Sequence, residues 1–182
     1  MKTKSRIRQQ LANFMFVREF SKQKRKPKLI SFAKMKSVGI LYDATTDENY
    51  ELVKQLVKEI RSEHKEALAL GYVDMKELPH MRFSKLGLDF FTRRSLSWNL
   101  RPNHPLVHNF VQTDFDVLIS LDIETVFPLK YVSAISHAKF KIARFDKRNT
   151  PFCDFMVAAP DNTRMEELIK VLMHYLKQMR ND

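Results

Sequence analysis

Cysteine and glycine are both scarce in this sequence, and each scarcity excludes a class of site. The 182 residues include one cysteine, Cys153, and three glycines, Gly39, Gly71 and Gly87. A single cysteine rules out an internal disulfide and every metal or redox motif built from several cysteines. The glycine spacing excludes the G-x-G-x-x-G dinucleotide loop and the Walker A loop. A thiol-bearing chain without disulfides is compatible with the cytoplasm, the location that we expect.

Long hydrophobic runs are also missing. The apolar stretch 11–17 has the minimum length of a signal-peptide core, but Arg18 and Glu19 follow it where a small-residue cleavage site would stand. No stretch approaches the roughly 18 apolar residues that a membrane-spanning helix needs. The basic composition of the N-terminus is shared by organellar presequences, and that alternative stays open.

Acidic residues are nearly absent from the first 36 positions. This segment holds twelve Lys or Arg residues against one acid, Glu19, a net charge of +11, whereas the other 146 residues hold 20 basic and 20 acidic side chains and are neutral. Blocks of like charge commonly bind polyanions. We therefore expect a basic amphipathic arm over residues 1–36 and a single α/β domain over 37–182. The cations expected to contact nucleic acid are Arg6, Arg8, Arg18, Lys22, Lys24, Arg25, Lys26 and Lys28.

The arm also has apolar residues at helical spacing. Placed on a helix, they form one stripe suited to docking on a partner: Ile7, Leu11, Phe14, Val17 and Phe20. A polybasic run follows, in which Pro27 prevents the helix from continuing. RNA, as in the ribosome or another ribonucleoprotein, would take the cations onto its phosphates, and we favour this partner. An anionic membrane, or a partner protein bound through the stripe, is the alternative.

The rest of the chain alternates between strand and helix patterns. Short apolar runs predict strands over residues 38–42, 67–73, 88–92, 115–121, 140–145 and 155–158. Apolar residues at helical spacing predict helices over about 47–63, 105–111, 128–137 and 163–179. Thr45 with Glu48 and Thr163 with Glu166 have capping-box spacing. Near-continuous apolar strands favour a mostly parallel sheet covered on both faces, a three-layer Rossmann-like α/β sandwich.

Several of these segments, taken in order, resemble a family of short bacterial proteins that carries only a label of a domain of unknown function. The resembling segments are SVGILYDATTDENYELVKQLVKEI, LGYVDMKELPHM, LDFFTRRSLSW and FDVLISLDIETVFPLKYVSAISHAKFKIARF, with the closing helix. The resemblance covers roughly residues 30–180 and implies an α/β body that follows a basic N-terminal segment. It assigns no activity to the protein, because the family has none assigned. A weaker likeness, of the fourth segment alone, is to one strand-helix-strand unit of heptosyltransferase-like glycosyltransferases.

A crevice at the ends of the strands is the alternative site. Asp43 and Asp122 each follow an apolar strand, and Thr45 opens a helix, so a small-molecule enzyme or sensor could use these three residues. Asp47 and Glu48 in the same turn would repel a phosphate. We interpret the carboxylates mainly as caps and turn formers.

The remaining candidates have structural interpretations. His104 and His108 are four residues apart, but no third metal ligand is signalled, so we read them as a helix-start and a surface histidine. Cys153 is interpreted as a small core residue. Trp98 is the one tryptophan, and we expect it to pack against the sheet edge rather than stack on a base. No catalytic residue, metal site or cofactor is predicted.

Overall fold

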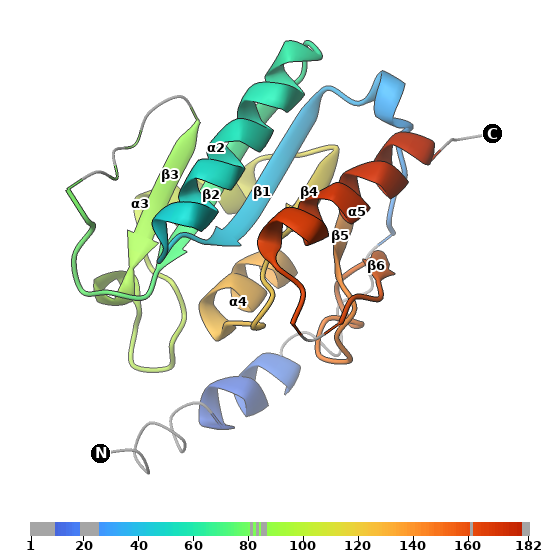
Figure 1. The fold of residues 1–182 in the computed structure, drawn as a ribbon. Helices are drawn as coiled ribbons and strands as arrows, with labels where there is room; N and C mark the ends of the chain where they lie inside the picture. Colours follow the sequence, from blue (N-terminus) through green and yellow to red (C-terminus); the bar gives the residue numbers. More distant parts are fainter. Residues whose placement is uncertain are drawn as a thin grey trace.

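One parallel sheet organises the chain (Figure 1). The computed structural model describes residues 10–18, 26–80, 82, 84, 87–160 and 162–179. Within these ranges, six strands pair in the order β3-β2-β1-β4-β5-β6, and every neighbouring pair is parallel. The strands are β1 (Ser37–Asp43), β2 (Glu66–Val73), β3 (Leu88–Thr92), β4 (Val117–Ser120), β5 (Phe140–Arg144) and β6 (Phe155–Val157).

Helices cover both faces of this sheet. One face packs against α2 (Asp47–Ser62) and α5 (Met165–Gln178), and the other against α3 (Pro105–Gln112) and α4 (Phe127–Ile135). Two short 3-10 turns, η1 (Phe32–Lys34) and η2 (Arg93–Ser95), complete the described elements. The predicted three-layer Rossmann-like α/β fold is confirmed. The strands are buried on both sides, and this is why they read as nearly continuous apolar runs in the sequence.

The helix starts differ from the predicted caps by one residue. The cap of α2 is Thr46, whose hydroxyl accepts the N–H of Asn49 at 3.2 Å. The hydroxyl of Thr45 instead accepts the N–H of Asp74, at the end of β2, at 3.0 Å. In α5 the cap position belongs to Arg164 rather than Thr163. The predicted capping boxes were therefore wrong. At each helix start, two adjacent residues could serve as the N-cap, and the sequence pattern did not distinguish them.

Part of the predicted arm packs against the rest of the protein. Residues 10–18 form a helix, here called the N-terminal helix, in which Ala12 and Phe16 are buried. Further along, Phe32 and Met35 belong to the core under α2 and α5. The boundary at residue 36 stays a prediction from charge, and the apolar packing of the body begins before it. In the described part of the chain, no helix has the length and hydrophobicity needed to cross a membrane.

Candidate nucleic-acid interface

A parallel sheet has two unlike edges, and each carries a hollow in this protein. We call the end where the strands begin the amino edge; Lys36 and Lys139 directly precede β1 and β5 there. The opposite end is the carboxyl edge, where Asp43 ends β1 and Asp122 follows β4. The basic run reaches the amino edge, and the predicted crevice lies at the carboxyl edge.

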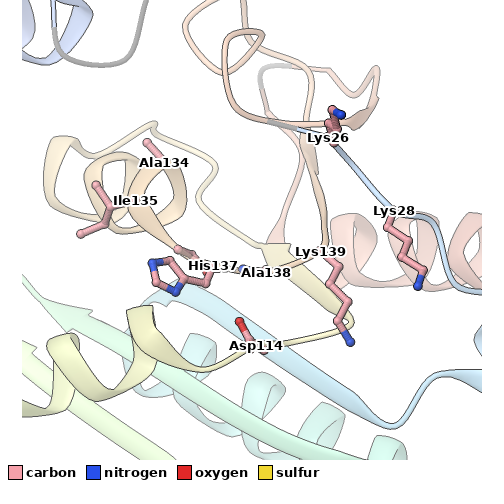
Figure 2. Close-up of a pocket in the computed structure, with 9 residues that line it drawn as sticks. Lys26, Lys28, Asp114, Ala134, Ile135, His137, Ala138 and Lys139 are labelled. Carbon is pink, nitrogen blue, oxygen red and sulfur yellow. Dashed lines mark hydrogen bonds between the residues drawn. The ribbon is translucent and has the colours of Figure 1, made fainter. Parts of the chain in front are cut away.

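An open hollow of about 610 Å³, the basic hollow, lies at the amino edge (Figure 2). Its lining comes from Lys26, Lys28, Asp114 and residues 134–139. The backbone N–H of Lys28 donates to the carbonyl of Lys139 at 3.0 Å, which holds the basic run beside the start of β5. In the view of Figure 2, the side chains of Lys28 and Lys139 extend in the same direction from these two segments. The hollow therefore collects cations from distant parts of the sequence.

The described lysines from residue 26 to the start of β1, here counted together with the basic run, are exposed, and their charges are not neutralised. Among the residues that the structure describes, the ammonium groups of Lys26, Lys28, Lys34 and Lys36 form no ion pair with a carboxylate. The nearby Asp116 is already engaged, because it accepts from Lys139 Nζ at 2.7 Å and from the N–H of Lys36 at 2.7 Å. Partial burial opposes ionisation, but these hydrogen bonds prevail and lower the pKa of Asp116.

A buried lysine lies behind the hollow. Lys141 is fully buried, and its Nζ donates to the carbonyls of Ser133 at 2.6 Å and Ala134 at 3.0 Å, in the last turn of α4. The carbonyl end of a helix carries partial negative charge and repels anions. Since Ala134 also lines the basic hollow, the Lys141 ammonium offsets that repulsion where an anion would bind.

The N-terminal helix is anchored by its inner face. The ring of Phe16 contacts Phe127 and Phe152 with centroids 6.0 and 5.8 Å apart. Lys130 Nζ lies 4.4 Å from the Phe16 ring centroid and donates to Asn13 Oδ1 at 3.2 Å. The apolar spacing of the arm did not predict this anchor, because Phe16 does not belong to the predicted stripe. The sequence signal that could have predicted the anchor is an aromatic residue on the side of the helix away from the stripe.

The predicted contact residues are only partly described. Leu11, Phe14 and Val17 are exposed on the face of the helix opposite Phe16, and Arg18, Lys26 and Lys28 are also exposed. The other predicted contacts lie outside the described residues: Arg6, Ile7, Arg8, Phe20, Lys22, Lys24 and Arg25.

The carboxyl edge has a smaller hollow of about 290 Å³, the acidic hollow, between β1 and β4. The strand order reverses direction along the chain at this pair, so the hollow occupies the expected switch point. Its polar lining is Asp43, Asn49, Glu124, Asn162 and Thr163. Of the three predicted crevice residues, only Asp43 lines the hollow. No lysine or arginine is among these described lining residues, so the acidic hollow disfavours phosphate.

Asp122 is buried next to this hollow. Burial raises its pKa to about 7, the charge of Asp43 adds to the rise, and the N–H groups of Val126 and Thr125 oppose it. Its Oδ1 has no hydrogen-bond partner among the described residues. Thr125 has a positive φ of 54°, uncommon for a β-branched residue, and its hydroxyl donates to Asp146 at 3.0 Å. The carboxyl edge thus holds a buried carboxyl group that titrates near neutral pH.

The other singled-out residues have structural roles, except Trp98. His104 caps α3 by accepting the N–H of Leu106 at 3.3 Å, and His108 is an exposed histidine bonded to Asn103 at 3.1 Å. Cys153 is buried, as interpreted. The described residues contain no group of three or more side chains suited to a metal. Trp98 is 68% exposed, so its predicted packing on the sheet edge was wrong.

The chain matches the model of a known protein family. A family model described as "Family of unknown function (DUF6913)" matches residues 8–179. The match confirms the resemblance to a family without an assigned activity. No curated protein matches the chain, and the weaker likeness to a glycosyltransferase unit stays a prediction.

Proposed function

The chain belongs to this family of unknown function, and we propose that it binds RNA, alone or within a ribonucleoprotein such as the ribosome. The basic run and the basic hollow at the amino edge would form the binding surface. The proposal concerns binding to the phosphate backbone and includes no catalytic step.

The observation that carries this proposal is the unmatched charge of residues 1–36. Their net charge is +11 next to a neutral body. If these cations served only the fold, the described ones would pair with carboxylates of the body. Instead Lys26, Lys28, Lys34 and Lys36 are exposed, and they form no ion pair with a carboxylate among the described residues. Such a surface releases the counterions of a nucleic acid when it binds, which favours association at low salt.

The charges at the carboxyl edge also support RNA binding at the amino edge. Exposed guanidinium groups at the carboxyl edge already form ion pairs, such as Arg93 with Asp74 at 2.5 Å and Arg148 with Asp146 at 2.5 Å. The acidic hollow there would repel a phosphate. At the amino edge, the four lysines form no ion pair with any carboxylate in the described part of the chain, so this is the side that an RNA backbone would approach.

A salt titration of the full chain against a fluorescently labelled structured RNA tests the proposal. If about half of the arm's cations meet phosphates, log affinity should fall with log salt with a slope of about −5. The variant Lys26→Glu/Lys28→Glu should bind more weakly, with a slope smaller by about 2. The control Lys58→Glu/Lys147→Glu changes the net charge equally at exposed positions elsewhere and should bind like the natural protein. Binding that does not depend on salt, or equal losses in both variants, would overturn the proposal.

A small-molecule site at the carboxyl edge is the second candidate, and Asp122 is the observation that favours it. A carboxyl group with a pKa near 7 beside a hollow at the switch point is typical of functional sites. The acidic lining would select a neutral or cationic compound. If Asp43→Asn/Asp122→Asn abolishes function in cells while deletion of residues 1–36 is tolerated, this candidate replaces RNA binding.

A further inference from the structure

The N-terminal helix has two apolar faces, and the body of the protein covers only one of them. The inner face buries Ala12 and Phe16, each 2% exposed. The outer face consists of Leu11, Phe14 and Val17, whose exposed fractions are 48%, 66% and 59%. These residues are three positions apart, so they share one side of the helix. Anchoring of the helix explains the inner face and leaves the outer face without a structural purpose.

The exposed Trp98 is carried by a loop that adjoins this helix. An isolated β-bridge between Leu96 and Pro102 closes the loop. Leu100, from the same loop, packs against the apolar cluster that contains Ala12 and Phe16. The guanidinium of Arg101 lies 5.2 Å from the ring centroid of Tyr131, which also contacts Phe16. The loop and the helix are thus held on the same aromatic cluster, at the carboxyl-edge end of the molecule (Figure 1).

A positive charge adjoins the outer face. Arg18 lies at the end of the described helix and is exposed, and further lysines and arginines follow it in the sequence. A helix with an exposed apolar side, basic neighbours and a nearby tryptophan has the composition of segments that lie in the headgroup region of anionic membranes.

We propose that Leu11, Phe14, Val17 and Trp98 insert into the interface of an anionic lipid membrane, while the Arg18 guanidinium contacts a lipid headgroup. None of these residues lines the basic hollow, whose described cations are Lys26, Lys28 and Lys139, so the inference does not depend on RNA binding. A lipid interface fits better than RNA, because leucine and valine cannot stack on bases. Since the helix is folded and anchored before contact, insertion would not require it to order.

Trp98 gives a direct test, because it is the single tryptophan of the chain. The full protein is mixed with vesicles of phosphatidylcholine alone or with phosphatidylserine added, and tryptophan emission and vesicle flotation are measured. We expect a blue shift of the emission and co-flotation with the anionic vesicles only. Absence of both effects with anionic vesicles would overturn the proposal.

Matched variants locate the contact. Leu11→Ser/Phe14→Ser should reduce partitioning into anionic vesicles at least tenfold and leave RNA affinity within twofold. The control Val171→Ser/Tyr175→Ser removes two exposed apolar residues from α5 and should partition like the natural protein. Equal partitioning of both variants would contradict the assigned surface. Loss of RNA affinity in Leu11→Ser/Phe14→Ser would assign the outer face to the ribonucleoprotein and overturn lipid binding.

Failure of this proposal can be told apart from failure of RNA binding. The variant Lys26→Glu/Lys28→Glu should lose RNA affinity and still show the blue shift with anionic vesicles. If vesicle insertion disappears in that variant together with RNA binding, one undivided surface serves both ligands, and the separate lipid surface is wrong.

Discussion

The arginines at the carboxyl edge and the described lysines of residues 26–36 at the amino edge differ in whether they form ion pairs. At the carboxyl edge, arginines are used in pairs, as in Arg82 with Asp47 and Arg148 with Asp146. At the amino edge, the described lysines of the basic run have no carboxylate partner, and the nearby Asp116 is occupied by Lys139. At the carboxyl edge, where Rossmann-like sheets usually bind phosphates, the described lining of the acidic hollow offers no lysine or arginine to an anion. The charge available to a polyanion lies at the other end of the strands.

The largest expected effect concerns the buried carboxyl group at the carboxyl edge. The pKa of Asp122 is about 7 in the folded protein and near 3.8 when unfolded. The folded state therefore holds the proton more tightly, so the free energy of unfolding should fall as pH rises from about 4 to 7. The full loss above pH 7 is about 4 kcal/mol. Asp122→Asn should remove most of this dependence, as measured by urea denaturation at several pH values.

Asp146→Asn is the control for that experiment, because the hydrogen bond from Arg148 keeps the pKa of Asp146 far below its usual range. Above pH 5, Asp146→Asn should leave the shape of the pH profile unchanged. If the pH profiles of the natural protein and Asp122→Asn are parallel, ionisation of Asp122 does not destabilise the folded protein, and the prediction is wrong.

Substitution of lysines at the amino edge should change the affinity for RNA rather than the stability of the fold. Lys28→Glu/Lys34→Glu/Lys36→Glu should weaken binding to structured RNA on the order of 10²-fold at moderate salt, because three phosphate contacts become repulsive. The variant Lys58→Glu/Lys76→Glu/Lys147→Glu has the same net charge and alters exposed lysines elsewhere. Similar losses in the two variants, measured by fluorescence anisotropy, would remove the distinction between the edges.

Detaching the N-terminal helix should have a local effect. Phe16→Ala removes the ring that packs on Phe127 and Phe152. Hydrogen exchange of residues 10–18 should accelerate, while the global free energy of unfolding changes by less than about 1 kcal/mol, because the helix lies outside the main core. RNA affinity should stay within about twofold, since Lys28 is held independently by Lys139. Global unfolding at lower denaturant would instead make the helix part of the core.

The smallest effects are expected for the ion pairs themselves. Arg94 and Glu77 at the carboxyl edge are mostly exposed, so Arg94→Ala should change stability by no more than about 0.5 kcal/mol. Lys139→Ala at the amino edge leaves the largely buried Asp116 with fewer donors and should cost about 1 kcal/mol. Thermal denaturation of the two variants compares the pairs, and an equal change would mean that burial of Asp116 does not matter.

Local patterns predicted most of the elements. The strand at 88–92 has the predicted bounds, and α3 differs from its prediction by one residue, because periodicity and a proline at the helix start are readable within a few positions. The caps of α2 and α5 were missed by one residue, since adjacent side chains compete for the same position. Asp43 lines the hollow between β1 and β4, whereas the Thr45 hydroxyl accepts the N–H of Asp74 after β2.

The sequence by itself determined the order of the elements and the separation of charge between residues 1–36 and the rest, because both are sums over neighbouring residues. Only the tertiary structure decided which side chains are covered. Phe16 turned inward, Trp98 remained exposed, and Asn13 met Lys130 across 117 positions of the chain. Burial and pairing depend on groups that folding brings together from distant positions, and no local pattern records those partners.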